Sequence, residues 1–135
     1  MKKVLLFIFL AALVGFGVAY YMYNKPVESL ADVSPVHSLT ANELFSAYEN
    51  DEAEADSMNL NKVIEVSGIV QDVMSDTSGV TLTLQTASGI FGVKCQMDKN
   101  EQPTDIQKGQ EVRLKGICTG YLMDVVLVRC VKSGK

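Results

Sequence analysis

Between residues 63 and 131, apolar and polar residues alternate in short runs that turn-forming residues separate. A period of two is typical of β-strands with one face in a core and the other in water. Gly68 lies inside the first run, where a glycine suits a bend or bulge of a long strand. In the last run the alternation places Val126, Val128 and Cys130 inside and Arg129 outside. The pattern predicts five strands, at residues 63–73, 80–85, 91–97, 111–118 and 124–131.

The connections between these runs indicate how the strands are arranged. Three are short, and the one after the fourth strand, residues 119–123, contains Gly120. Residues 98–107 form a longer polar connection with Pro103 and room for one helical turn. A long third connection is where the OB-fold places its crossing helix. We therefore predict a mainly β fold, a five-stranded Greek-key OB-fold barrel, with an SH3-like barrel or small sandwich as the alternative.

A short helical segment precedes the strands. Thr40 and Glu43 have the spacing of a capping box, in which each side chain bonds the other residue's backbone. Leu44, Phe45 and Tyr48 follow at helical spacing, and a second short turn is expected to have Ala55, Met58 and Leu60 facing inward. This segment is expected to cover the barrel. Its acidic outer face is either simply solvated or a surface for a basic partner.

The N-terminus is the most apolar part of the chain. Lys2 and Lys3 precede about 20 uncharged residues, 4–23, which as a helix would span a hydrocarbon core of ~30 Å. Three tyrosines at the far end suit the membrane interface, and the lysines favour a cytoplasmic N-terminus. We predict a single-pass signal-anchor in the cytoplasmic (inner) membrane, with the rest exported to the periplasm or cell exterior. A cleaved signal, with small residues at 17–19, is the alternative.

These segments divide the chain into three parts: a transmembrane segment at 1–24, a linker at 25–39, and a helix plus barrel at 40–135. The linker contains two prolines and three serines without periodicity, which predicts an extended spacer. His37, the single histidine, lies in it and has no second ligand nearby, so we expect it to be solvated.

The chain resembles the tRNA-anticodon-like OB-fold family over roughly residues 40–132. The resemblance lies in the capping-box helix and in the segments KVIEVSGIV, GVTLTLQT, VKCQM and KGQEVRLKGICTGYLMDVVLVRC. It implies a small bacterial protein, often with an N-terminal membrane segment. Because these motifs are alternating and glycine-based, they indicate a fold rather than an activity, and no catalytic residue carries over.

All three cysteines, Cys95, Cys118 and Cys130, occupy predicted core positions. In an OB-fold barrel the third and fifth strands are parallel neighbours, so Cys95 and Cys130 can approach bridging distance. Cys118 lies at the opposite end from Cys130. In an oxidising compartment we therefore predict a Cys95–Cys130 disulfide, with three buried thiols as the alternative. No CxxC pair is present, so no zinc site and no other cofactor is expected.

Charge argues against nucleic acid as a ligand. Residues 40–135 contain 14 acidic and 9 basic residues, a net charge of −5. OB-folds bind single strands on the outer face of the second and third strands and on adjacent loops. Here that face has one lysine and no aromatic residue for stacking. The residues expected on the candidate ligand face are Thr81, Thr83, Gln85, Lys94 and Gln96, together with Tyr121 from a loop.

The function follows from these exclusions. No serine or cysteine lies in a nucleophile motif, so we expect no enzyme. The prediction is a membrane-anchored, exported OB-fold binding module for an unidentified protein, peptide or glycan. A single-stranded nucleic-acid-binding protein is the alternative.

Overall fold

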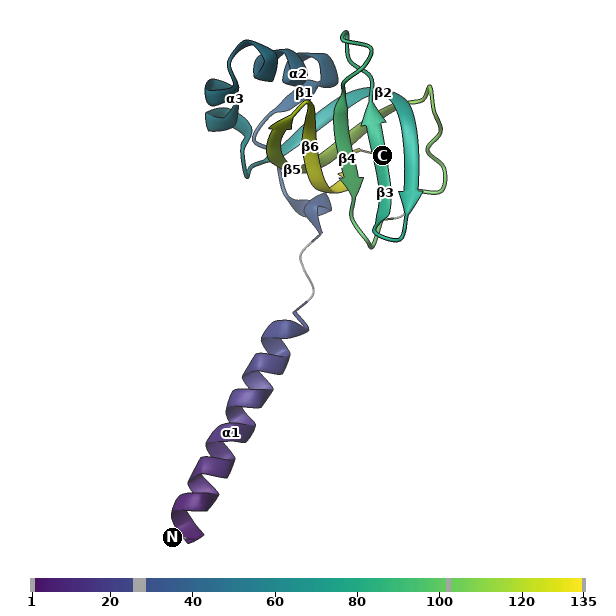
Figure 1. The fold of residues 1–135 in the computed structure, drawn as a ribbon. Helices are drawn as coiled ribbons and strands as arrows, with labels where there is room; N and C mark the ends of the chain where they lie inside the picture. Colours follow the sequence, from purple (N-terminus) through teal and green to yellow (C-terminus); the bar gives the residue numbers. More distant parts are fainter. Residues whose placement is uncertain (1, 26–28, 102, 135) are drawn as a thin grey trace.

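The computed structural model describes residues 2–25, 29–101 and 103–134 (Figure 1). An apolar helix and a short lead-in precede two helices and a β-barrel. The elements are α1 (Lys2–Tyr23), the 3-10 helix η1 (Leu30–Asp32), β1 (Ser38–Thr40), α2 (Ala41–Asn50), α3 (Glu52–Asn59), β2 (Val63–Asp76), β3 (Gly79–Leu84), β4 (Val93–Met97), β5 (Glu111–Leu122) and β6 (Asp124–Lys132).

Five strands close into a barrel. β2 pairs with β3, β3 with β4, β4 with β6, and β6 with β5, and β5 returns to pair with β2. All of these pairings are antiparallel except the parallel pairing of β4 with β6. This order confirms the OB-fold barrel. The third connection contains no helix among its described residues, and the helices that cover the barrel come before its first strand.

The alternating residues of β2 to β5 fill the core as predicted. β3 and β4 are regular, with every second residue buried. For β6 the predicted phase is wrong at two positions, since Val125 and Leu127 are buried while Val126 and Val128 are half-buried. An irregularity near Arg129, whose φ is 54°, resets the alternation and returns Cys130 to the core. A bulge of this kind inserts a residue and shifts the face of those before it.

The helices α2 and α3 are part of the same core. The Glu43 N–H donates to Thr40 Oγ1 (3.2 Å), and the Thr40 N–H donates to the Glu43 carboxylate (2.8 Å), which confirms the capping box. Leu44, Phe45 and Tyr48 are all buried against the barrel. The helices therefore cover it, because their apolar stripe has no other surface to pack on.

Most of the segment expected to be a spacer, from Leu30 onward, lies against the barrel. Leu30 is buried. Lys115, a residue that is only 7% exposed, donates from its Nζ to the carbonyls of Ala31 (2.8 Å) and Val33 (2.7 Å). β1 pairs in parallel with β2. Thus residues 30–40 are a structured lead-in. His37, expected to be solvated, is half-buried with its Nε2 3.0 Å from Asn59 Oδ1.

The helix α1 has the length and composition of a membrane span. Its window Leu6–Tyr23 has a mean hydropathy of 2.0 and none of its residues is buried. A helix that is apolar on every side satisfies its backbone hydrogen bonds internally and leaves its side chains for lipid. The structure thus contains a helix long and apolar enough to cross a membrane.

All three cysteines are free and buried in the structure. A hydrogen bond with Cys95, together with burial, raises the pKa of the Cys130 thiol well above its ordinary value. Cys118 lies elsewhere in the core, with its Sγ 3.4 Å from Tyr48 Oη. The two thiols expected to pair are therefore neighbours, while the bond between them stays a prediction.

Candidate ligand-binding face

The outer surface of β3, β4 and β6 forms one continuous face, which we call the β3–β4–β6 face. Thr81 lies opposite Gln96, Thr83 lies opposite Lys94, and Lys94 in turn lies beside Val126. Gln85 follows β3 directly and is exposed. The structure thus brings together five of the six side chains expected on the ligand face, because alternate residues of paired strands share one side.

Tyr121 does not belong to this face. It lies within β5, which continues to Leu122, and not in the predicted turn. Its ring stacks on Tyr48 (centroids 5.6 Å apart, planes at 24°) and meets Phe45 edge-on (5.9 Å, 77°). Aromatic pairs in these geometries stabilise packing. Tyr121 therefore joins the end of the β5–β6 hairpin to α2.

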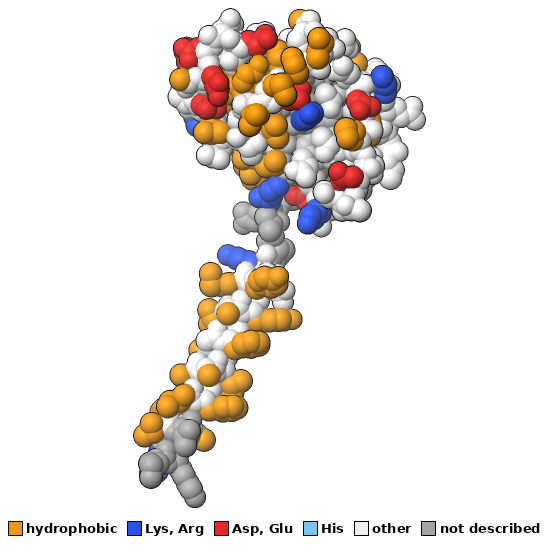
Figure 2. All heavy atoms as spheres, viewed as in Figure 1, with side chains coloured by type: hydrophobic (Ala, Val, Ile, Leu, Met, Phe, Trp, Pro, Cys, Tyr) orange, Lys and Arg blue, Asp and Glu red, His pale blue; other side chains and the backbone are white. Residues whose placement is uncertain are grey.

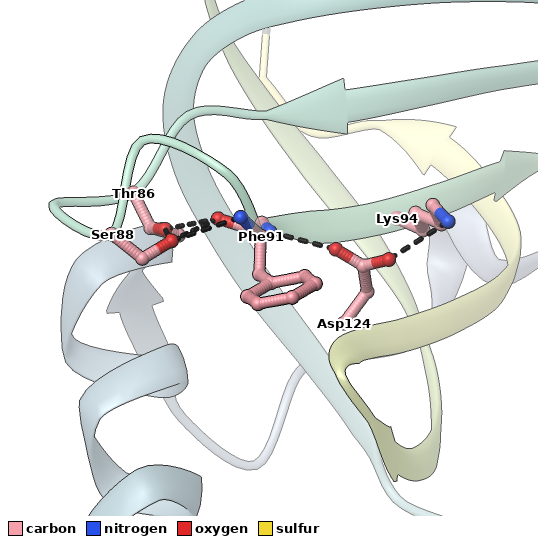
Figure 3. Close-up of polar contacts among 6 residues, drawn as sticks. Thr86, Ser88, Phe91, Lys94 and Asp124 are labelled. Carbon is pink, nitrogen blue, oxygen red and sulfur yellow. Dashed lines mark hydrogen bonds and ion pairs between the residues drawn. The ribbon is translucent and has the colours of Figure 1, made fainter.

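The single lysine of the face is already paired. Lys94 Nζ lies 2.8 Å from Asp124 Oδ2, and the Gly92 N–H donates to the other carboxylate oxygen (2.8 Å) (Figure 3). Asp124 could not be placed beside Lys94 from the sequence, because only the parallel pairing of β4 with β6 brings the two residues together. The face is consequently close to neutral.

The β3–β4 loop, residues 85–92, is held in one shape by polar contacts. Ser88 Oγ accepts from the Phe91 N–H (3.0 Å) and donates to the Phe91 carbonyl (2.7 Å), which the Thr86 hydroxyl also contacts (Figure 3). The Ala87 N–H donates to Asn42 Oδ1 (2.6 Å), which ties the loop to α2. The exposed residues of this loop are therefore presented by a fixed backbone.

An exposed apolar rim borders the face at this end. Ile90 in the loop is 79% exposed, and Leu122 and Met123 at the β5–β6 turn are 82% and 62% exposed. The Gly92–Asp124 hydrogen bond joins the loop to the turn. Figure 2 shows hydrophobic side chains on the surface where α2, this hairpin and the β3–β4 loop meet. Met123 has a φ of 67°, which is uncommon for a residue with a side chain and more frequent at functional sites.

At the other end of the face lies a cavity of about 350 Å³. Ser78 of the β2–β3 turn and Gln96 of β4 line it together with Arg129, whose Nε is 3.6 Å from Asp98 Oδ2. The face therefore runs from an apolar rim, across hydroxyl and amide groups, to a cavity lined by both polar and apolar side chains. Such groups bind a ligand by hydrogen bonds and apolar contact. No cluster of metal-ligating side chains occurs in the part of the chain that the structure describes.

Gly92 fixes the start of β4, and we expect Gly92→Ala to lower the free energy of unfolding by about 1–3 kcal/mol. The new Cβ would lie 2.3 Å from the Leu84 carbonyl oxygen. Gly92 cannot easily move away, because its N–H bonds Asp124 and its carbonyl accepts from Val125 (3.1 Å). Urea unfolding of both chains measures the difference.

Gly68→Ala is the control for this prediction, because the added Cβ meets a milder steric conflict there. Its Cβ would lie 3.1 Å from Ala41 Cβ and 3.4 Å from Leu84 Cβ, so these neighbours would have to give by only a few tenths of an ångström. The loss should therefore be smaller than for Gly92→Ala. Equal losses at both positions would contradict the role assigned to the Leu84 carbonyl.

Comparison with known proteins agrees with the fold. Neither the curated proteins nor the solved structures gave a match. One family model, tRNA_anti-like, matches residues 1–132, and so covers α1 as well as the barrel. This match confirms the resemblance found in the sequence, and the chain belongs to the tRNA_anti-like family.

Proposed function

We propose that this protein is a membrane-anchored, exported binding module that holds a peptide segment of a partner protein on its β3–β4–β6 face, without catalysing a reaction. The closed OB-fold barrel and the family support a binding module. The observation that carries the choice of face is the apolar rim, formed by Ile90, Leu122 and Met123 beside a neutral polar surface. Exposed apolar side chains gathered at one place mark interaction sites.

The chemistry of the rim favours a peptide over a sugar or a base. Sugars and bases stack on exposed aromatic rings, whereas the aromatic residues near this face, Phe91 and Tyr121, are half-buried and packed against the core. Aliphatic and methionine side chains instead fit an apolar peptide side chain, and methionine adapts to several shapes. Thr81, Thr83 and Gln96 then supply hydrogen bonds to its backbone.

Site-specific crosslinking in intact membranes tests this proposal. A photoreactive residue at Gln96, on the face, should capture a partner protein, whereas one at Arg113, on β5 across the barrel, should not. Adding Leu122→Ser and Ile90→Ser should reduce the Gln96 crosslink several-fold, because the rim then loses its apolar contacts. The same partner captured with equal yield from both positions would contradict the assignment of the face.

Membrane topology is a separate expectation. Lys2 and Lys3 begin α1 and tyrosines end it, so the barrel should lie outside the cytoplasmic membrane. A phosphatase that is active only after export, fused after residue 135, should be active, and a galactosidase that works only in the cytoplasm should be inactive. The reverse pattern would place the barrel in the cytoplasm and remove the exported part of the proposal.

Nucleic acid is expected to bind no better than ~10⁻⁴ M at physiological salt, which is ordinary non-specific affinity. Lys94 is already neutralised by Asp124. Stacking of a base on an aromatic ring would contribute ~1–3 kcal/mol, but the residues of this face include no exposed ring. A labelled oligonucleotide is titrated with the full chain in phosphatidylcholine nanodiscs at two salt concentrations. Micromolar binding with a steep salt dependence would make the nucleic-acid alternative the better function.

A further inference from the structure

A second surface lies apart from the β3–β4–β6 face, between the lead-in and the helices. Here α2, α3 and β1 enclose a groove of about 400 Å³, which we call the helical groove. Four apolar residues line it, Leu39, Ala47, Ala55 and Met58, and we call these four the floor of the groove. Met58 is exposed there, although helical spacing in the sequence predicted that it faces inward. No residue of the groove belongs to the β3–β4–β6 face, so its function can be tested independently.

Three acidic residues also line the groove, Glu43, Asp51 and Glu54, and we call them its acidic edge. Residues 41–59 contain six acidic residues and no lysine or arginine. Figure 2 shows acidic side chains on the α2–α3 pair. The nearest lysine along the chain, Lys62, donates to the carbonyl of Ser57 (2.8 Å) near the other end of α3. The lining of the groove therefore combines apolar side chains with negatively charged ones.

Two of these carboxylates are fixed in position by helix capping. Thr40 holds the carboxylate of Glu43, and the backbone and hydroxyl bonds from Thr40 lower the pKa of Glu43. Asp51 Oδ1 accepts from the Glu54 N–H (3.0 Å) at the start of α3. The Glu54 carboxylate itself has no hydrogen bond or ion pair with the described residues, so it is available to a partner.

We propose that the helical groove binds a basic segment of a partner protein, which inserts one apolar side chain into the floor while flanking lysines or arginines meet the acidic edge. Charge complementarity selects this partner, because an acidic or uncharged segment gains nothing from the edge. Small residues at Ala47 and Ala55 leave room for the inserted side chain, and Met58 adapts to its shape.

The test uses the full chain in phosphatidylcholine nanodiscs, whose neutral lipid does not itself attract a cationic probe. The probe is a fluorescent nine-residue peptide with a central leucine and four lysines or arginines on each side. One control peptide has serine in place of leucine, another has glutamates in place of the basic residues, and empty nanodiscs report binding to lipid. The leucine peptide should bind, and either control peptide should bind at least several-fold more weakly.

Matched variants separate the groove from general negative charge. Glu52 and Glu54 both lie in the first turn of α3, but only Glu54 lines the groove. Glu54→Lys should raise the Kd of the leucine peptide about five- to tenfold, and Glu52→Lys less than twofold. Met58→Ser should also weaken binding, whereas Met74→Ser, at an exposed methionine of β2, should not.

Each other result would overturn the proposal. Equal effects of Glu52→Lys and Glu54→Lys would show attraction to the acidic helices in general. Equal binding of the serine peptide would show that the floor takes no part, and tighter binding of the glutamate peptide would exclude a basic partner. Absence of binding by the leucine peptide, with the fold verified by circular dichroism, would remove the site.

Discussion

Leu44→Ala is expected to lower the free energy of unfolding of the barrel by about 2–5 kcal/mol. Leu44 lies in α2 and is fully buried against the barrel core. Truncation removes the transfer free energy of the side chain and leaves a cavity that its neighbours fill only in part. A loss of this size is a large share of the stability of a small domain. Chemical unfolding followed by circular dichroism measures it.

Ser46→Ala is the matched control for this prediction. Ser46 is two residues further along α2 and is exposed, so its replacement should change stability by no more than about 0.5 kcal/mol. If Leu44→Ala were as mild as Ser46→Ala, then α2 would unfold separately and would not belong to the cooperative unit of the barrel.

A disulfide between Cys95 and Cys130 is expected to add about 3–4 kcal/mol, because it closes a loop of roughly 35 residues in the unfolded chain. The two thiols are neighbours in the core, where the interaction with Cys95 raises the pKa of the Cys130 thiol. Because this interaction and burial raise the pKa of the Cys130 thiol, little of that thiol is ionised in the folded protein at neutral pH. The bond should therefore form during oxidative folding and only slowly in the folded, reduced chain.

Thiol counting and thermal unfolding test the disulfide together. The exported protein, denatured without reductant, should show one free thiol, from Cys118, and reductant should lower its melting temperature. Cys118→Ser should leave this difference unchanged, and Cys95→Ser should abolish it. Three free thiols in the unreduced, denatured protein would exclude the bond.

The local pattern of apolar and polar residues was sufficient to predict most of the helices and strands. Alternation identified every strand of the barrel, because each strand has one face in the core and one in water. The capping box at Thr40 marked the start of α2, since its hydrogen bonds join residues only three positions apart. The length of the N-terminal apolar run identified α1. The residues expected together on the outer side of β3 and β4 do share one side, because alternate residues of paired strands point the same way.

Features that depend on contacts between distant residues could not be predicted in this way. The phase of β6 depends on an irregularity near Arg129, and the composition of this strand allows either phase. The pairing of Lys94 with Asp124, and the contact of Lys115 with the lead-in, join residues about 30 and 80 positions apart. The apolar rim lies in two segments that read as ordinary turns. Sequence periodicity reports which side of its own strand or helix a residue occupies, whereas a binding surface forms where several such elements meet, and that arrangement exists only in the folded chain.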